Sequence, residues 1–220
     1  MMIIANLKMY LNTIDDIKKF QVDMADYKDS FIVAPQSIYL QNFIDNGFKV
    51  AAQNVSDEEF GPYTGEISPK SLFDLNIEYV MIGHSEVRER YFNESNYILQ
   101  KVLKAIKNNL NVILCIGEKK GEDVYKIIDE RLHDIVPNKN LIISYEPIWA
   151  IGCNSIPDFE SLENIATYIK RKGYNTVLYG GSVNATNIRE LIKVKSIDGF
   201  LVGSSAINPS EFKKIIEVVR

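Results

Sequence analysis

The sequence holds few of the residues that bind metals or form disulfides. Among 220 residues there are two cysteines and two histidines. Cys115 and Cys153 lie far apart in the chain and form no CxxC pair, which argues against a disulfide framework or a zinc knuckle and fits a reducing cytosol. No P-loop or Rossmann fingerprint is present either, so we expect neither a metal nor an organic cofactor.

Excess positive charge and long apolar runs are also lacking. The net charge of -4 and the sequence pI of about 5.4 give no electrostatic footprint for nucleic acid or an anionic membrane. No apolar run approaches the length of a membrane span, and the first residues, MMIIANLKMY, have no basic region typical of a signal peptide. We therefore expect a cytoplasmic protein that binds neither nucleic acid nor membrane.

What the sequence does contain is a series of short apolar runs rich in β-forming residues. There are eight of them: MIIANL, FIVA, KVAAQ, YVMI, NVILCI, LIISY, TVLYG and GFLVG. Nearly continuous apolar runs, as opposed to alternating ones, are typical of strands that are covered on both faces by helices. The runs therefore predict eight parallel strands.

Between these runs lie segments with the period and the punctuation of helices. Thr13, after Asn12, can begin one helix, and Gly47 can end another. The other expected helix boundaries are Ser68-Pro69, Ser95, Asp158 with Gly173, and Ser210-Glu211. The alternation continues without a linker or a shift in composition, so it predicts an α/β fold, a single-domain (β/α)8 barrel over residues 1–220. A doubly wound open sheet is the main alternative.

Polar residues stand directly after several of the predicted strands, where a barrel collects its chemistry. Asn6 and Lys8 end the first run, His84 follows YVMI, and Glu146 follows LIISY. Each has an ordinary interpretation when taken alone. A lysine at a strand end usually reaches solvent, a histidine there can cap the next helix, and a carboxylate before a proline is a common loop residue.

Two glycine-rich turns follow the seventh and eighth runs. Gly180-Gly181-Ser182 and Gly203-Ser204-Ser205 are weak signals individually, since such dipeptides mark many turns. Together they occupy the loops where barrels commonly hold a phosphate on backbone N–H groups. With a base candidate, a histidine and a lysine beside them, they predict metal-free proton transfer on a phosphorylated substrate.

Eight motifs in this order make the sequence resemble the triosephosphate isomerase family. They are ANLKMY, AAQN, YTGEIS, GHSE, CIGE, YEPIWAIG, YGGSV and GFLVGS, and they run from about residue 5 to about residue 205. As a set they are highly specific. The resemblance implies a TIM barrel enzyme without a cofactor that interconverts dihydroxyacetone phosphate and D-glyceraldehyde 3-phosphate through an enediolate, in glycolysis and gluconeogenesis.

The resemblance also implies a role for each polar residue at the strand ends. Glu146 would be the base that moves a proton between adjacent carbons, and His84 the neutral electrophile that polarises the carbonyl. Lys8 would supply positive charge beside the enediolate, Asn6 would hydrogen-bond the substrate, and Glu86 would hold Lys8. A carboxylate can deprotonate such a weak carbon acid only if the oxyanion is stabilised as it forms.

Residues 146–157 resemble the mobile lid of the family, with a first hinge at 147–149 and a tip at 150–154. Closure would bring the backbone amides of Ile151 and Gly152 to the phosphate and exclude water. The other residues that the resemblance assigns to substrate binding or to the closed lid are Gly181, Ser182, Gly203 and Ser204 near the phosphate, Tyr179 with Ser182 as latch partners, and Leu201 with Ile151 as an apolar cover on the base.

Some positions depart from the family pattern. Leu7 replaces the usual tryptophan between the asparagine and the lysine, and the arginine pair after GHSE is reduced to Arg88. The lid ends in Asn-Ser-Ile-Pro at residues 154–157, and Ser204 replaces the second glycine of the last phosphate loop. None of these changes removes a catalytic side chain.

Two alternatives to an isomerase remain. One is another phosphate-binding barrel enzyme with different chemistry, and the other is a catalytically dead barrel kept for interactions.

The segment 54–66 is long and polar for a loop between a strand and a helix, yet it contains Phe60 and Tyr63. Loops of that length are usually functional, and exposed aromatic side chains on one suggest a partner surface. In the family that the sequence resembles, this loop enters the neighbouring subunit, and the threonine of TGE, here Thr64, contacts its active site. A homodimer is thus expected, with a tetramer of such dimers left open.

Overall fold

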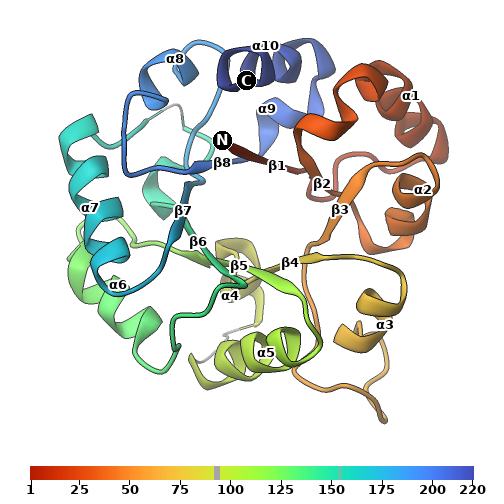
Figure 1. The fold of residues 1–220 in the computed structure, drawn as a ribbon, viewed down its shortest axis with the longest axis horizontal. Helices are drawn as coiled ribbons and strands as arrows, with labels where there is room; N and C mark the ends of the chain where they lie inside the picture. Colours follow the sequence, from red (N-terminus) through yellow and green to blue (C-terminus); the bar gives the residue numbers. More distant parts are fainter. Residues whose placement is uncertain (92–94, 154) are drawn as a thin grey trace.

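The computed structural model describes residues 1–91, 95–153 and 155–220, and in this part of the chain eight parallel strands close into a barrel ringed by helices (Figure 1). Each strand pairs with the next one along the chain, and the last strand pairs with the first. This closure confirms the predicted (β/α)8 barrel. An open doubly wound sheet is excluded, because it would leave two edge strands unpaired.

The strands are β1 (Met2–Asn6), β2 (Ile32–Ala34), β3 (Lys49–Ala52), β4 (Tyr79–Ile82), β5 (Asn111–Ile116), β6 (Leu141–Tyr145), β7 (Thr176–Tyr179) and β8 (Gly199–Val202). The α-helices are α1 (Ile14–Met24), α2 (Leu40–Asp45), α3 (Pro69–Asp74), α4 (Ser85–Tyr91), α5 (Ser95–Lys107), α6 (Val124–Leu132), α7 (Phe159–Arg171), α8 (Ile188–Leu191), α9 (Ser204–Ile207) and α10 (Pro209–Val219). Short 3-10 turns are η1 (Ala25–Ser30), η2 (Ser37–Tyr39) and η3 (Ile148–Ala150). Each predicted strand run contains one of the strands.

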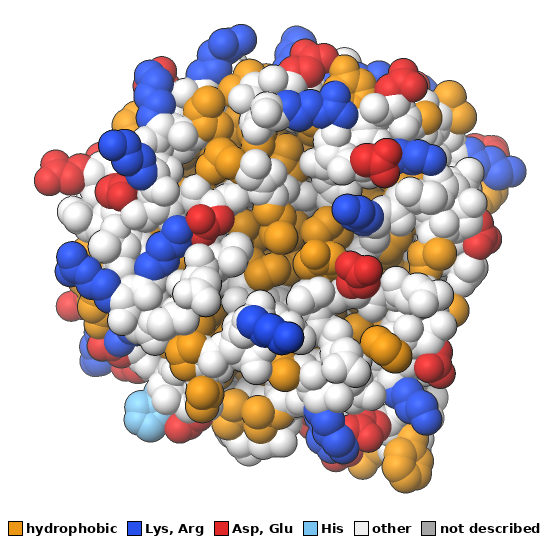
Figure 2. Space-filling model, in the orientation of Figure 1, with side chains coloured by type: hydrophobic (Ala, Val, Ile, Leu, Met, Phe, Trp, Pro, Cys, Tyr) orange, Lys and Arg blue, Asp and Glu red, His pale blue; other side chains and the backbone are white. Residues whose placement is uncertain are grey.

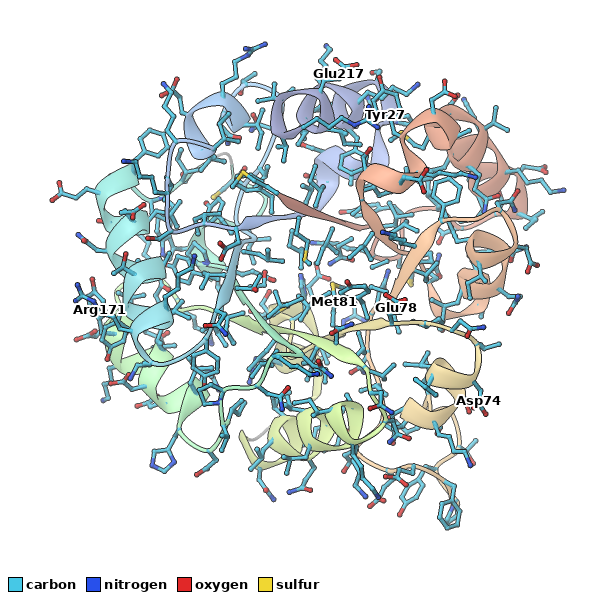
Figure 3. The ribbon with its side chains drawn as sticks, in the orientation of Figure 1. Tyr27, Asp74, Glu78, Met81, Arg171 and Glu217 are labelled. Carbon is cyan, nitrogen blue, oxygen red and sulfur yellow. The ribbon has the colours of Figure 1, made fainter. Side chains whose placement is uncertain are left out.

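Two apolar layers hold the strands, one inside the barrel and one between the strands and the helices. The interior layer is small, and its members come from all eight strands: Ile4, Ile32, Ala34, Ala51, Met81, Ile113, Cys115, Ile142, Leu178 and Leu201. Figure 3 shows Met81 near the centre of the ring, with Asp74 and Arg171 toward its outside. Hydrophobic side chains also gather at the centre of the face in Figure 2, inside a rim of intermixed charges.

Alternation along the strands decides which polar side chains reach the barrel's axis. Successive residues of a strand point to opposite faces, so a residue two positions after an interior one also faces the interior. Asn6 stands two positions after Ile4, and Glu146 stands four after Ile142. The carboxyl ends of the strands therefore present these two side chains toward one another across the mouth of the barrel.

Helix boundaries follow the capping signals in most places. Thr13 begins α1 with a full capping box to Asp16, and the Asp158 side chain accepts the Ser161 N–H at the start of α7. The predicted start at Ser210-Glu211 is wrong, because α10 begins at Pro209. The carboxamide oxygen of Asn208 caps it and accepts the N–H groups of both residues that had been assigned to the boundary.

The ring of helices also joins the two halves of the chain. In Figure 3, Tyr27 of η1 and Glu217 of α10 lie beside each other, and the Tyr27 hydroxyl donates to the Glu217 carboxylate at 2.6 Å.

Within the described residues, no helix is both long enough and apolar enough to cross a membrane.

Truncation of Phe43 should destabilise the helix layer without changing the site. Its ring is fully buried on α2 and meets Phe20 and Phe48 edge to face, with centroids 6.0 and 5.4 Å away. Phe43→Ala should lower the free energy of unfolding by about 3–5 kcal/mol, because it removes apolar contacts and leaves a cavity. Urea titration measures this change, and a loss below about 1 kcal/mol would contradict the packing described here.

Candidate active site

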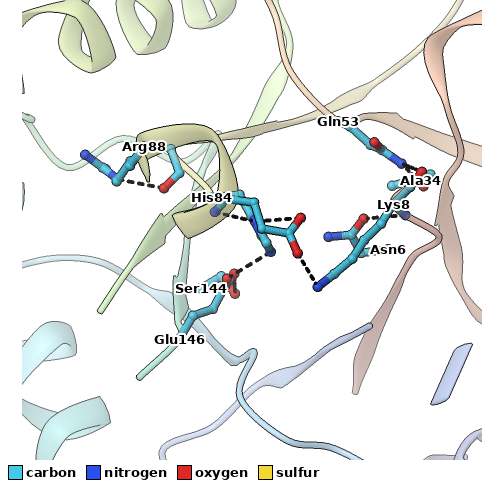
Figure 4. Close-up of polar contacts among 10 residues, drawn as sticks. Asn6, Lys8, Ala34, Gln53, His84, Arg88, Ser144 and Glu146 are labelled. Atoms are coloured by element: carbon cyan, nitrogen blue, oxygen red, sulfur yellow. Dashed lines mark hydrogen bonds and ion pairs between the residues drawn. The ribbon is translucent and has the colours of Figure 1, made fainter. Parts of the chain in front are cut away.

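A cavity of about 590 Å³ opens at the carboxyl ends of β1, β3 and β4. Its lining includes Asn6, Lys8, Gln53, His84 and Glu86. Figure 4 shows Asn6, Lys8, Gln53 and His84 converging on one region, with Ser144 and Glu146 reaching it from β6 and the residue that follows it. The residues predicted at the ends of separate strands thus come together in space.

Lys8 is held by its backbone as well as by its charge. Its φ of 47° lies in the left-handed region, which is unfavourable for a residue with a side chain. Its N–H donates to the Asn6 carboxamide oxygen at 3.0 Å, and the Gln53 amide donates to its carbonyl at 2.9 Å. The same Gln53 nitrogen also donates to the carbonyl of Ala34 at 2.9 Å. Neighbouring strands therefore fix the bend that aims the lysine.

Glu86 places a carboxylate between the lysine and the histidine. The Lys8 ammonium donates to Glu86 Oε1 at 2.7 Å, and His84 Nδ1 lies 3.7 Å from Glu86 Oε2. Burial raises the pKa of Glu86, but the hydrogen bond and the charge of Lys8 outweigh this effect and leave the pKa below its usual value. The carboxylate stays ionised at neutral pH and keeps the ammonium in place.

His84 is buried, and its hydrogen bonds indicate which nitrogen carries the proton of a neutral ring. The backbone N–H of Glu86 donates to His84 Nδ1 at 3.3 Å, so Nδ1 acts as an acceptor. Nε2 then carries the hydrogen of the neutral imidazole, and it lies 3.4 Å from Glu146 Oε2. The donor side of the ring thus faces the carboxylate across the cavity.

Glu146 is 2% exposed and is enclosed by its neighbouring strands. Its Oε1 accepts the Ser144 hydroxyl at 2.9 Å, whereas its Oε2 has no hydrogen bond within the described residues. The residues that pack against Glu146 from the two neighbouring strands' ends, Gly117 and Gly180, have no room for a side chain. A Cβ at Gly117 would lie 1.8 Å from the Glu146 carbonyl oxygen, and one at Gly180 would lie 2.5 Å from Glu146 Cγ. One carboxylate oxygen is therefore anchored and the other is available.

Behind the carboxylate lies a second cavity of about 420 Å³, which Glu146, Arg88 and Arg131 all line. The Arg88 guanidinium donates to the carbonyls of Gly83 at 2.7 Å and Cys115 at 3.3 Å. Burial, helped by the nearby Arg131, lowers the pKa of Arg88 to about 10. It therefore remains positive at neutral pH, on the side of Glu146 away from Lys8.

Comparison with known proteins identifies the family of the chain. A sequence model described as triosephosphate isomerase matches residues 1–219. Curated relatives with that name include proteins from Mesomycoplasma hyopneumoniae (40% identical, 97% of both chains), Coprinopsis cinerea (38%, 87% of this chain and 85% of the relative) and Shewanella denitrificans (34%, 91% and 89%). The chain belongs to the triosephosphate isomerase family. It is thus a member of a family of isomerases.

Residues 146–157, which the resemblance leads us to expect as a lid, are hydrogen-bonded to the barrel through Trp149 in this structure. The Trp149 indole donates to the Glu118 carboxylate at 2.6 Å, and the Tyr145 hydroxyl donates to the same oxygen at 3.2 Å. The Ile151 N–H donates to the Ile148 carbonyl at 3.3 Å and so is engaged within the turn. Gly152 is exposed, whereas Asn154 at the expected tip lies outside the described residues.

The glycine-rich turns after β7 and β8 lie at the same end of the barrel. A Cβ on Gly203 would be 3.5 Å from Lys8 Cε, which brings the last turn close to the lysine. Ser204 begins α9 and lines a cavity of about 610 Å³, while the Ser182 carbonyl accepts the Asn187 amide at 2.8 Å. Gly181 gives room to the Tyr179 hydroxyl, which is buried without a partner among the described residues.

Three of the expected residues lie apart from these contacts. Leu201 is buried in the interior layer of the barrel, while Ile151 is half-buried on the lid segment. Thr64 is exposed on the loop after β3 and does not line the cavity around Lys8 of its own chain. In the described residues, no group of three His, Cys, Asp or Glu side chains is arranged to hold a metal ion.

The sequence did not indicate several residues that organise the site. Gln53 and Glu118 lie in the quoted motifs AAQN and CIGE, but nothing in the spacing showed that they would hold Lys8 and Trp149. Gly117 also lies in CIGE, but the sequence did not show that it would pack against the Glu146 backbone. The only sequence signal for Ser144 was a hydroxyl that follows three apolar residues in LIISY. Its neighbours on the adjacent strands are known only once the strands are paired.

The two cysteines should react very differently with a thiol reagent. Burial raises the pKa of the Cys115 thiol well above its usual value, and the negative charge of Glu146 adds to the effect, whereas Cys153 is exposed. Ellman's reagent at pH 8 should therefore titrate one thiol rapidly in the folded protein and the second only in denaturant. Cys153→Ser should abolish the rapid phase, and two rapid thiols in the parent would contradict the burial of Cys115.

Proposed function

We propose that this chain interconverts dihydroxyacetone phosphate and D-glyceraldehyde 3-phosphate, in glycolysis and gluconeogenesis. The observation that carries the proposal is one continuous set of contacts across the cavity. Lys8 lies 2.7 Å from Glu86, Glu86 lies 3.7 Å from His84, and His84 lies 3.4 Å from Glu146. A cation, a neutral donor and a carboxylate base in this order supply what proton transfer next to a carbonyl requires.

In the proposed reaction, Glu146 removes a proton from the substrate carbon beside the carbonyl. The free Oε2 is the available acceptor, because Oε1 already accepts the Ser144 hydroxyl. His84 Nε2–H donates to the carbonyl oxygen as negative charge develops there, while the Lys8 ammonium stabilises the enediolate and the Asn6 carboxamide hydrogen-bonds the substrate. His84 then takes the proton of the hydroxyl on the deprotonated carbon, which replaces the proton it gave to the former carbonyl oxygen. Return of the proton from Glu146 to the former carbonyl carbon completes the isomerisation, and a carbonyl forms where the hydroxyl stood.

The phosphate would be held by backbone N–H groups at Gly181, Gly203 and Ser204, with Ser182 beside them. Closure of the lid would add the amides of Ile151 and Gly152. In this scheme the buried Tyr179 hydroxyl and Ser182 act as latch partners, and Leu201 with Ile151 forms the apolar cover on the base. The support is the proximity of Gly203 to Lys8 and of the Tyr179 hydroxyl to Gly181, where a Cβ would lie 2.3 Å from it.

Two other functions are distinguished by one assay. A phosphate-binding barrel with different chemistry, or a catalytically dead barrel, would show no turnover of D-glyceraldehyde 3-phosphate in a coupled assay. The proposed enzyme should turn it over with a chelator present and no cofactor added, and 2-phosphoglycolate, which resembles a phosphorylated enediolate, should compete. Absence of turnover would overturn the proposed activity.

We also propose that the chain forms one catalytic domain over residues 1–220, works in the cytoplasm and assembles as a homodimer. The two free cysteines suit a reducing compartment. The loop after β3 is exposed at Phe60, Tyr63 and Thr64, and the Phe60 side chain is 88% exposed. A partner subunit that buries this loop beside its own Asn6 and His84 would account for the exposed aromatics.

Glu146→Gln should lower kcat by at least about 10²–10⁴-fold, because the amide keeps the shape of the side chain but cannot accept the proton. Circular dichroism should show an unchanged fold, and 2-phosphoglycolate should still compete. Near-normal turnover by the variant would show that another group is the base.

Deletion of residues 57–63 should produce a monomer that keeps the circular dichroism of the barrel and loses most of its activity. The reason is that Lys8 and His84 would lose the partner's loop, which is proposed to hold them in place. Light scattering at micromolar concentration measures the assembly. An intact protein that is a fully active monomer under these conditions would contradict the proposal.

A further inference from the structure

Ser144 introduces a hydroxyl where the barrel interior is otherwise apolar. It lies on β6 and is completely buried, and its neighbours in register are Cys115 of β5 and Leu178 of β7. Both neighbours belong to the apolar interior layer. A hydroxyl in such surroundings costs free energy unless it finds a hydrogen-bond partner.

Its partner is the carboxylate to which the proposed reaction assigns proton transfer. The Ser144 hydroxyl, two residues earlier in the chain, donates to Glu146 Oε1 at 2.9 Å. We infer that Ser144 is a positioning residue for Glu146, which fixes one carboxylate oxygen so that the other faces His84 and the substrate. This inference rests on the proposed isomerase activity.

The contact divides the work between the two carboxylate oxygens. Oε1 is occupied by the hydroxyl, while Oε2 lies 3.4 Å from His84 Nε2 and has no hydrogen bond within the described residues. A buried carboxylate on a flexible glutamate side chain can rotate unless one end is fastened. The hydroxyl fastens it with a hydrogen bond to an ionised group, which is stronger than one between neutral groups.

The adjoining strand is shaped around this pair. A Cβ on Gly180 would lie 2.8 Å from Ser144 Oγ and 2.5 Å from Glu146 Cγ. Any larger residue at this position would push the hydroxyl and the carboxylate out of line. Gly180, the first glycine of the YGGSV motif, thus makes room for the pair and also belongs to the turn proposed to hold the phosphate.

A residue that only fills space would tolerate loss of its hydroxyl, since alanine differs from serine by that group alone. A positioning residue would not, because small displacements of a reacting group reduce the rate strongly. The loss should appear in kcat, where the geometry of the base matters, and little in KM, because the hydroxyl donates its hydrogen bond to Glu146 and not to the phosphate turns or Lys8.

The test compares Ser144→Ala with a matched control. Ser196 also donates its hydroxyl to a glutamate, Glu163 Oε1 at 2.6 Å, outside the cavity. Ser144→Ala should lower kcat about tenfold with KM changed less than about twofold, whereas Ser196→Ala should leave kcat unchanged. Ser144→Thr, which keeps the hydroxyl, should restore kcat to within about threefold of the parent.

The outcomes separate the inference from the function on which it rests. An unchanged or increased kcat in Ser144→Ala, or an equal fall in the Ser196→Ala control, would overturn the positioning role while the parent remains an isomerase. Failure of the parent itself to turn over the triose phosphate would overturn both. Circular dichroism confirms folding of each variant, and the kcat and KM of Ser144→Ala decide the matter alone if the threonine variant does not fold.

Discussion

The buried carboxylate of Glu146 sets the conditions that the surrounding strands must meet. A charged group removed from water is costly unless hydrogen bonds and opposite charges compensate it. The strands on both sides also lie close to it: the Glu146 N–H donates to the Ile116 carbonyl at 2.7 Å, and the Gly180 N–H donates to the Tyr145 carbonyl at 2.9 Å. That approach leaves no space for a side chain at Gly117 or Gly180.

Charged and polar side chains lie on both sides of the Glu146 carboxylate. Arg88 is positive on the side of the second cavity, and on the other side His84 presents a neutral donor, followed by the Glu86 and Lys8 pair. Because Glu86 is ionised and accepts a hydrogen bond from Lys8, it holds the lysine without neutralising the donor side of the histidine. The result is a cavity in which positive charge and a hydrogen-bond donor are fixed before a substrate arrives, which is the condition for electrostatic stabilisation without reorganisation.

The fold could be predicted from the sequence because its signals are local. Apolar runs give strands, and caps such as Thr13 and Asp158 give helix starts, since each depends on residues a few positions apart. The start of α10 was misplaced because Asn208, just before Pro209, is a better cap than the serine after it. The contacts of Ser144, Gln53 and Glu118 could not be predicted in this way. They depend on which residues face each other after the barrel closes, and the residues themselves lie far apart in the chain or look like ordinary strand members.

Residues 146–157, the proposed lid, and the residues near them contain both hydrogen-bonded and unbonded polar groups. The fastened position gives Trp149 a hydrogen bond to Glu118 but leaves the Tyr179 hydroxyl buried without a partner among the described residues. An unsatisfied buried polar group costs about 1–3 kcal/mol, and a hydrogen bond to a charged acceptor is worth a similar amount. If closure of the proposed lid breaks the first bond and gives the Tyr179 hydroxyl a better partner, the gain offsets part of the loss. In the proposed function, a phosphate that binds only the closed position would shift this equilibrium by its difference in affinity for the two states.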